Sequence, residues 1–328
     1  MVEGATLSAD LSDADWLKAL RSIGEEHGSY SDLGKDFSAL FVEQSQRVLF
    51  VAFETVLGIR AISDTGMPVA FDICEQRNWS HLTLLSRQQT WFRDERVFNF
   101  FDKLSDMGLF DMFDRVIFYG SGMCGYAAGV FSVAAPGSTV LMAAPQATLD
   151  RSLTHWDDRF PSTRRLDFTD RYTYAPDMIE AAEKAVVIFD PDEVEDSMHA
   201  SLFRGSNVIT QRYRRGSAGS IEADLRATSL IAHIAQRAAD GELTEASLAK
   251  LMRIRRRHVP YLRALLSRVQ NEDRPGLTTR LCRAVLADQP LPRFQKALDQ
   301  AEAILAKRRP APSPEEQPDI TQRNMPRT

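Results

Sequence analysis

A glycine-rich turn is the part of this sequence best suited to chemistry. It lies in "RVIFYGSGMCGYAAGVFSVAAPGSTVLM", residues 115–142, where an apolar run meets a cluster of glycines, a small-residue segment and a second apolar run. This pattern predicts a strand, a sharp turn, a helix and another strand. Enzymes mount a nucleophile at the apex of such a turn, where the side chain projects into a cleft. Ser121 and Cys124 are the nucleophilic residues within it.

The spacing of small residues selects the apex of this turn. The strand and the helix approach closely, so the residues two before and two after the apex must be small. With Gly122 at the apex these residues are Gly120 and Cys124, and Gly125 comes next. An apex at Ser121 or at Cys124 would put a bulky residue into one of these positions. The predicted apex is therefore a glycine, which has no nucleophilic side chain.

Three segments carry a resemblance to a known group of proteins. "YGSGMCGYAAG" resembles the nucleophile elbow of α/β-hydrolase-like proteins of the type Y-G-S-S-M-G-G-Y-A-A, whose second serine aligns with Gly122. "VLMAAPQATLDRSLTHWDDRF" is similar to the strand, Pro-Gln and W-D-x-R-F segment of a group of bacterial relatives, and "FDPDEVEDSMHASLFRGSNV" is similar to their later acidic loop. The resemblance covers roughly residues 35 to 215 and implies the α/β-hydrolase fold.

The resemblance also implies where a catalytic triad would lie. The acid follows a later strand, and Asp190 or Asp192 matches that place. The histidine should follow the last strand, near "RYRRGSAGS", where there is none, and His199 is a displaced candidate. With Gly122 in place of serine, two of the three triad roles are unfilled. Loss of any triad member removes most of the rate.

An oxyanion pocket needs only backbone amides. The N–H groups of Met123 and of a residue in "FETV", the segment that contains Glu54, could point into one cavity at the helix N-terminus. Such a cavity would bind an anion or a carbonyl without cleaving it. Glu54 could lie at this cleft or occupy an edge or cap position. The simpler structural alternative is that the segment is only a glycine-rich turn of a parallel sheet.

Similar bacterial sequences are also identified as phosphoadenosine phosphosulfate reductase. That family carries S-G-G-x-D-S after its first strand and a cysteine in E-C-G-x-H, and neither motif occurs in this sequence. Cys282, in "TRLCRAV", lies within a helical pattern and is expected in a core. The alternative stays open through Cys124, because a thiol at a helix N-terminus can have a lowered pKa.

Three hypotheses about function therefore stand. The first is a protein that keeps the hydrolase cleft and binds a small anionic or acyl-type ligand, or a partner, without hydrolysing it. The second is a hydrolase or acyltransferase with a shifted nucleophile, Ser121 or Cys124, supported by Asp190 or Asp192 and His199. The third is the sulfonucleotide reductase.

Two further segments combine charged and aromatic residues. In "WDDRF", residues 156–160, a local salt bridge with an aromatic anchor is expected, and a place in the cleft is the alternative. "RRLDFTDRYTYAPDM" carries Arg164, Arg165 and Arg171 beside two tyrosines. Arginines with aromatic residues can hold a phosphate, a sulfate or a carbohydrate, or can form a surface of stacked side chains.

The elements that position these residues alternate along the chain. "SDADWLKALRSIGEEHG" predicts an amphipathic helix that ends at Gly28, and "SALFVEQS" and "RVLFVAFET" predict two strands forming a hairpin. "HLTLLSR", "AVVIFDPDE" and "NVITQRYR" predict strands, whereas "ERVFNFFDKLSDMGLF" and "APDMIEAAEKA" predict helices. Alternation from about residue 80 to 215 indicates an α/β fold, a mostly parallel sheet with helices on both faces.

Beyond this region the pattern is only helical. It predicts four or five helices, interrupted at "DGEL", "HVP", "DRPG" and "QPLP". We therefore divide the chain into an N-terminal helix and linker (1–34), an α/β-hydrolase-like domain (35–217), a C-terminal all-helical region (218–308) and a Pro-rich tail (309–328) expected to be disordered.

Composition excludes several classes of protein. No apolar stretch among the 328 residues approaches the length of a membrane span, and the acidic N-terminus does not resemble an export signal, so a cytoplasmic location is expected. A net charge of −5 gives no general attraction to nucleic acid. The three cysteines lie far apart and no residues have the spacing of a metal site, so we expect neither metal nor cofactor.

Overall fold

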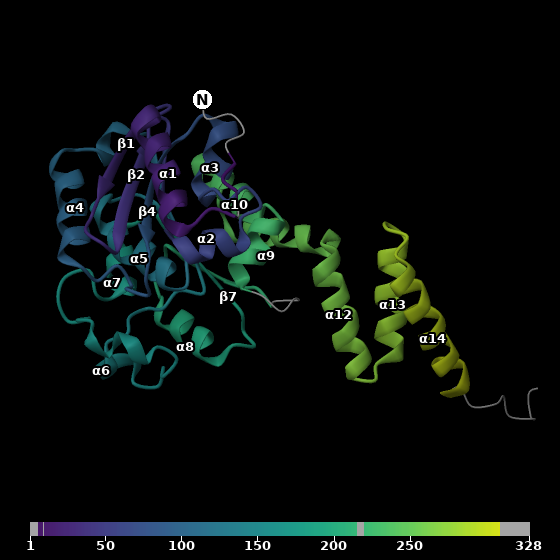
Figure 1. Cartoon of the computed structure of the whole chain (residues 1–328). Coiled ribbons are helices and arrows are strands. Elements are labelled where there is room, and N and C mark those ends of the chain that lie inside the picture. Colours follow the sequence, from purple (N-terminus) through teal and green to yellow (C-terminus); the bar gives the residue numbers. More distant parts are fainter. Residues whose placement is uncertain (1–5, 9, 215–219, 309–328) are drawn as a thin grey trace, which may run out of the picture. The chain divides into compact units, whose positions relative to one another are not determined.

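A single eight-stranded sheet forms the centre of the structure, a computed structural model that describes residues 6–8, 10–214 and 220–308 (Figure 1). The strand order is β1-β2-β4-β3-β5-β6-β7-β8. Strand β2 runs antiparallel to both of its neighbours, and all other neighbouring strands are parallel. The strands are β1 Gly28–Asp32, β2 Phe37–Val42, β3 Val48–Thr55, β4 Ser80–Ser86, β5 Arg115–Ser121, β6 Thr139–Ala143, β7 Lys184–Phe189 and β8 Val208–Arg212.

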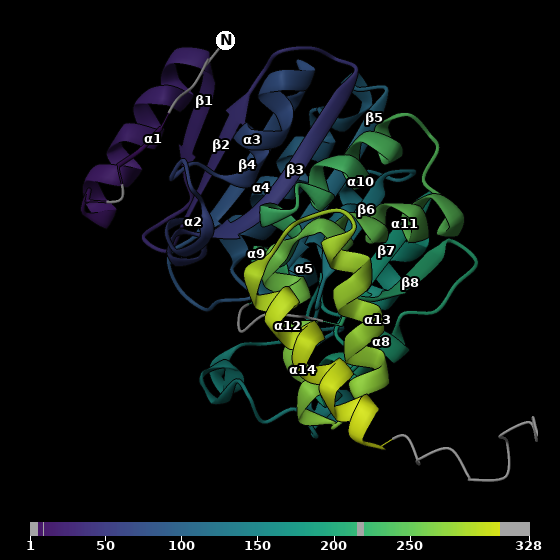
Figure 2. The same ribbon diagram turned by 90° about the vertical axis from the view of Figure 1, so that its right-hand side faces the viewer.

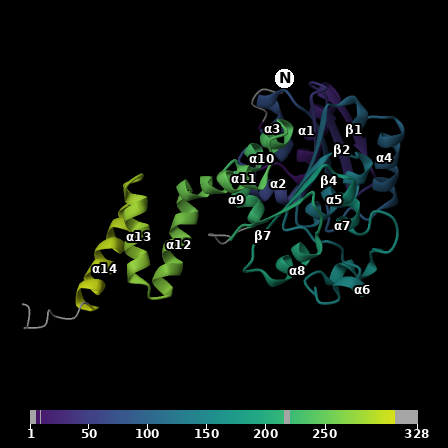
Figure 3. The ribbon, with the colours of Figure 1, turned by 180° about the vertical axis from the view of Figure 1, so that it is seen from behind.

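Helices cover both faces of this sheet, which confirms the predicted α/β class (Figure 1, Figure 3). The α-helices are α1 Asp13–His27, α2 Val56–Ile62, α3 Val69–Cys74, α4 Glu95–Asp106, α5 Met123–Phe131, α6 Arg151–Thr154, α7 Ala175–Met178, α8 Val194–Leu202, α9 Ile221–Ala227, α10 Leu230–Ala239, α11 Glu245–Leu251, α12 Val259–Asn271, α13 Pro275–Leu286 and α14 Pro292–Arg308. Short 3-10 helices are η1 Glu75–Arg77, η2 Phe110–Met112, η3 Ser132–Ala134, η4 Pro161–Arg165, η5 Ile179–Ala181 and η6 Met252–Arg257.

Strand β3 contributes to the apolar cores on both faces of the sheet. Leu49, Val51 and Phe53 pack in the core that includes α4, α5 and α7. Their even-numbered neighbours, Phe50 and Ala52 among them, pack in the core that includes α3, α9 and α10, which Figure 2 shows on the near side of the sheet. This alternation follows from the two-residue period of a strand. An apolar residue at nearly every position of β3 is therefore what a central strand requires.

The predicted hairpin of the two early strands is wrong. Both strands form, but β4 lies between them, with Ala39 of β2 opposite Leu84 and Ala52 of β3 opposite Thr83. The apolar residues of β3 are buried because β3 lies between β4 and β5 and has a core on each face of the sheet. An edge hairpin with β2 would leave part of this apolar surface uncovered. The sequence analysis also missed β1, whose polar residues "GSYSD" pair with β2 at the edge of the sheet.

The chain divides into two compact units, Met1–Arg255 and Arg256–Thr328. This boundary differs from the expected one at residue 217 because α9, α10 and α11 bury Leu225, Ile234 and Leu248 in a core of the sheet. The second unit has its own core, formed by α12, α13 and α14 around Leu266, Cys282 and Phe294. The predicted tail, 309–328, lies outside the described residues.

No helix in the described ranges is both long and apolar enough to cross a membrane.

Candidate functional site

The predicted strand, turn and helix are present around Gly122. Strand β5 ends at Ser121 and α5 begins at Met123. Between them Gly122 has φ 57° and ψ −124°, a conformation that favours glycine. Its N–H donates to the carbonyl of Ala143 at 2.8 Å, and its carbonyl accepts from the N–H of Tyr126 at 3.0 Å. These bonds fix the turn between β6 and the first turn of α5.

The closest approach of strand and helix occurs at Gly120. A Cβ atom at this position would lie 2.0 Å from the carbonyl oxygen of Cys124. A Cβ at Gly125 would lie 3.2 Å from the carbonyl oxygen of Gly120. At Gly122, by contrast, a Cβ would meet no atom of the described residues within 4 Å beyond its chain neighbours. The turn therefore requires glycine at 120 for space, whereas position 122 faces open space.

The N-terminus of α5 lies directly after the Gly122 turn. Met123 is the first helical residue and is half-buried. The first N–H groups of a helix have no acceptor within the helix, and they carry the positive end of the helix dipole. A second helix, α2, begins at Val56, after the neighbouring strand β3. Two helix N-termini thus follow adjacent parallel strands.

The two candidate nucleophiles differ in their surroundings. Ser121, the last residue of β5, is half-buried. Cys124 is only 5% exposed, and burial, together with the nearby carboxylates of Glu222 and Glu54, raises the pKa of its thiol well above the ordinary value. A thiol at a helix N-terminus can have a lowered pKa, but burial of the Cys124 thiolate acts in the opposite direction. Burial likewise raises the pKa of Cys282.

Glu54 is buried beside this turn and is bound on both carboxylate oxygens. It is 3% exposed, its Oε2 accepts from the N–H of Val69 at 2.8 Å, and its Oε1 lies 3.3 Å from Nη1 of Arg226. Arg226, from α9, also contacts Asp72 at 2.9 Å. Burial raises the pKa of Glu54 to about 8, although Arg226 opposes the shift. The sequence offered no signal for Arg226, which lies 172 positions further along the chain.

The register of the sheet places Glu54 and Ser121 each two residues beyond the last paired residues of neighbouring strands. Ala52 of β3 pairs with Tyr119 of β5, and both strands continue two residues further. Side chains two apart share a face of the sheet. Tyr119 is also on this face, and its hydroxyl is buried with no hydrogen-bond partner among the described residues. Burial, with the nearby carboxylates of Glu222 and Glu54, raises the pKa of Tyr119 well above its ordinary value.

The remaining triad candidates lie at other places. Asp190 directly follows β7, is buried, and accepts a hydrogen bond from the N–H of Asp192 at 3.0 Å. His199 lies in α8 and is fully buried. Its Nε2 is 2.9 Å from Oδ2 of Asp157, and its Nδ1 accepts from the N–H of Ala147 at 3.2 Å. In the described structure no hydrogen bond joins His199 to Ser121 or to Cys124, so the sheet does not bring these candidates together.

The partner of His199 belongs to a buried charge network in the "WDDRF" segment. The expected local salt bridge is present, because Arg159 binds Asp157 at 2.8 Å and continues to Asp196 at 2.7 Å. Burial alone would raise the pKa of Asp157, but hydrogen bonds from His199 and Arg159 lower it below its ordinary value. Both ring nitrogens of His199 are therefore engaged in hydrogen bonds within the protein, with Asp157 and with the N–H of Ala147. Neither is placed to accept a proton from Ser121 or Cys124.

Arg171, singled out with the tyrosines, is also structural. It forms ion pairs with Asp102 and Glu95 and packs over Tyr172, whose hydroxyl donates to Asp102 at 2.6 Å. In the described ranges no group of three or more His, Cys, Asp or Glu side chains could hold a metal ion.

No protein-family model matches the chain, and no curated protein matches it. Solved structures do. A putative esterase from Staphylococcus aureus is 11% identical over 74% of this chain and 97% of that chain, with a TM-score of 0.41. Carboxyl esterase 2 from the fungus Tuber melanosporum is 12% identical over 62% of this chain and 83% of that one, with a TM-score of 0.42.

A glycosylation associate protein complex from Streptococcus agalactiae also matches, at 13% identity over 65% of this chain, with a TM-score of 0.43. The match spans slightly less than half of that protein, 46%. At these identities and TM-scores we draw no conclusion from the likeness. The first compact unit is described by its own topology, a mostly parallel eight-stranded sheet between helices.

We expect Gly120→Ala to destabilise the first unit more than Gly122→Ala does. The first substitution forces a methyl group against a backbone carbonyl that cannot move without the helix, which should cost about 3 kcal/mol. The second adds only backbone strain, about 1–2 kcal/mol. Urea unfolding followed by tryptophan fluorescence measures both, since all four tryptophans lie before Arg255. Equal stability of the two variants would contradict the close approach at Gly120.

We expect Asp157→Asn to reduce the free energy of unfolding by about 3 kcal/mol, because it leaves the fully buried His199 and the guanidinium of Arg159 without their charged acceptor. Asp158→Asn is the matched control, since the side chain of Asp158 is 72% exposed and its removal should cost less than about 1 kcal/mol. The same urea titration measures both. A similar loss in the two variants would argue against the buried network.

The raised pKa of Glu54 predicts a pH-dependent effect of Glu54→Gln. Folded Glu54 keeps its proton up to a pKa of about 8, whereas an unfolded glutamate has a pKa near 4.5, so its contribution to stability falls as the pH rises through this window. The variant, which mimics the protonated form, should match the wild type near pH 5. At pH 9 it should be more stable by several kcal/mol, because each pKa unit corresponds to about 1.4 kcal/mol.

Unfolding at a series of pH values measures this difference, with Glu183→Gln as the control, because Glu183 is an exposed partner of Arg115. A difference between wild type and Glu54→Gln that stays constant from pH 5 to 9 would mean that Glu54 is ionised throughout.

Proposed function

We propose that this chain is a cytoplasmic protein of α/β-hydrolase-like fold that binds a small acyl-type or other anionic ligand at the Gly122 turn without hydrolysing it. The observation that carries the proposal is the conformation of Gly122, with φ 57° and ψ −124° at the start of α5 and open space where a side chain would project. In this interpretation the turn is a nucleophile elbow in which glycine has replaced the nucleophile.

The surroundings of the turn support binding without a catalytic nucleophile. Cys124 is held as a buried neutral thiol. His199 is bound to Asp157 and to the N–H of Ala147. Within the described residues no hydrogen bond joins Ser121 to a histidine, and a serine without its base retains little activity. The raised pKa of Cys124 also gives no support to the reductase alternative, because that chemistry requires a thiolate.

The ligand class follows from the donors at the carboxyl ends of β3 and β5. The first backbone N–H groups of α5, which begins at Met123, favour negative charge, and the short helix α2 begins at Val56 on the adjacent strand β3. A carbonyl or carboxylate oxygen accepts hydrogen bonds from such amides. Glu54 remains largely protonated near neutral pH, so it does not place a full negative charge beside the turn. A small carboxylate or an acyl carbonyl is therefore the proposed ligand.

Selective labelling with [¹⁵N]methionine tests this proposal directly. The chain has ten methionines, and Met123→Leu identifies the amide signal of Met123. Titration with butyrate should shift this signal, whereas chloride at the same ionic strength should not. Gly122→Val fills the open space and should abolish the shift. Gly137→Val is the matched control, because Gly137 also has positive φ and open space around its Cβ position.

An unchanged Met123 signal at high butyrate concentration would contradict the ligand class. We also expect no hydrolysis of p-nitrophenyl butyrate and no labelling by a fluorophosphonate. Stoichiometric labelling of Ser121, with hydrolysis lost in Ser121→Ala, would instead establish the hydrolase with a shifted nucleophile.

A further inference from the structure

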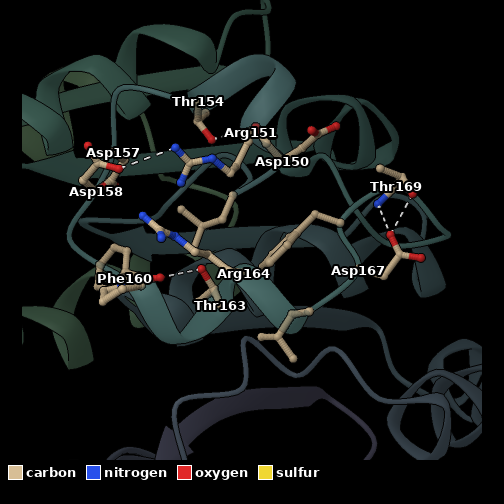
Figure 4. Close-up of a pocket in the computed structure, with 14 residues that line it drawn as sticks. Asp150, Arg151, Thr154, Asp157, Asp158, Phe160, Thr163, Arg164, Asp167 and Thr169 are labelled. Carbon is tan, nitrogen blue, oxygen red and sulfur yellow. Dashed lines mark hydrogen bonds and ion pairs between the residues drawn. The ribbon is translucent and has the colours of Figure 1, made fainter.

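The segment between β6 and β7 forms a pocket that contains none of the residues of the Gly122 turn (Figure 4). The pocket has a volume of about 150 Å³ and is formed by residues between Leu149 and Thr169, including α6 and η4. Apolar side chains, among them Phe160, Leu166 and Phe168, form part of its wall. An apolar cavity of roughly this volume accommodates a benzene ring.

Three of the carboxylates that line this pocket are already used within the protein. Asp150 caps α6 by accepting from the N–H of Ser152 at 2.9 Å. Asp157 is bound to Arg159 and His199. Asp167 accepts from both the N–H and the hydroxyl of Thr169, each at 2.7 Å, as Figure 4 shows.

The threonine hydroxyls that line the pocket also form hydrogen bonds within the protein. Thr154 donates to the carbonyl of Asp150 at 3.0 Å, and Thr163 donates to the carbonyl of Phe160 at 2.7 Å. Together with the hydroxyl of Thr169, these bonds hold the wall of the pocket in place. They leave few neutral donors for a ligand.

The guanidinium groups of Arg151 and Arg164 are the donors that remain. Arg151 faces Asp158 at 3.6 Å, which is longer than a hydrogen bond, and the side chain of Asp158 is 72% exposed. Arg164 has no ion-pair or hydrogen-bond partner in the part of the chain that the structure describes. Figure 4 shows both guanidinium groups on the same side of the pocket. Guanidinium groups bind carboxylates through paired N–H donors.

We infer that this pocket binds a small organic monocarboxylate whose apolar body is about the size of a benzene ring. Arg164 and Arg151 hold the carboxylate, and Phe160, Leu166 and Phe168 contact the apolar body. The exposed pair of Arg151 with Asp158 is weak and can be exchanged for the ligand at little cost. The fixed carboxylates at the wall repel additional negative charge, which favours a monoanion over a phosphate dianion. This site is independent of the one proposed at Gly122.

Calorimetric titration of the full chain with benzoate tests the inference. The wild type should bind benzoate, and Arg164→Gln should weaken binding at least tenfold. Arg151→Gln should also weaken it. Arg165→Gln is the matched control, because Arg165 is exposed like Arg164 but does not line the pocket, so the affinity of this variant for benzoate should stay within about twofold of wild type. Because benzoate is itself a small carboxylate, the titrations are repeated in the Gly122→Val background, where Arg164→Gln should still weaken the remaining benzoate binding at least tenfold.

Four results would overturn the inference. They are no binding of benzoate at millimolar concentration, equal affinity of wild type and Arg164→Gln, tighter binding of inorganic phosphate than of benzoate, and loss of benzoate binding in Gly122→Val. Tighter binding of phenylalanine than of benzoate would also count against the inference. It would mean that the pocket binds the α-ammonium group of an amino acid through Asp158, and that the ligand is not a simple monocarboxylate. The benzoate titration of Gly122→Val distinguishes failure of the pocket inference from failure of the binding site proposed at the Gly122 turn.

Discussion

The contact of β5 with α5 at Gly120 is the constraint on which the surrounding structure depends. With only hydrogen at Gly120, the strand can reach the carbonyl of Cys124, and the chain must then reverse within a single residue, Gly122. That reversal places the N-terminus of α5 at the carboxyl edge of the sheet, where β3 ends as well. The position of Met123 therefore depends on this approach, whereas Glu54 is held in place by its contacts with Val69 and Arg226.

Two buried charge clusters then tie distant segments to the ends of the strands. Arg226 joins α9 to Glu54 of β3 and to Asp72 of α3. In the segment that follows β6, Asp157 binds His199 of α8, and Arg159 binds both Asp157 and Asp196 of α8. In each cluster the buried carboxyl group is hydrogen-bonded to groups of the protein, which is the condition on which buried polar groups are tolerated. The residue types of a catalytic site are therefore present here, but most of them hold the fold together.

The sequence predicted what depends on neighbouring residues and missed what depends on distant ones. The strand, turn and helix around Gly122 follow from local spacing, and so do the apolar strands β3 to β8 and the long helix α4. Strand β1 was missed because an edge strand needs no apolar face. The place of β4 between β2 and β3, the binding of His199 to Asp157, and the pairing of Arg226 with Glu54 all join segments that lie far apart in the chain, for which one sequence holds no signal.

The alternation of side chains along β3 limits how this protein can change in length. Leu49, Val51 and Phe53 enter one core, and the residues between them enter the other. An insertion or deletion of one residue would exchange the two sets and turn Glu54 away from Arg226. Substitutions that preserve volume can accumulate in β3, whereas changes in length are restricted to the loops before and after it. The length of β3 is therefore constrained by the two cores into which its side chains pack.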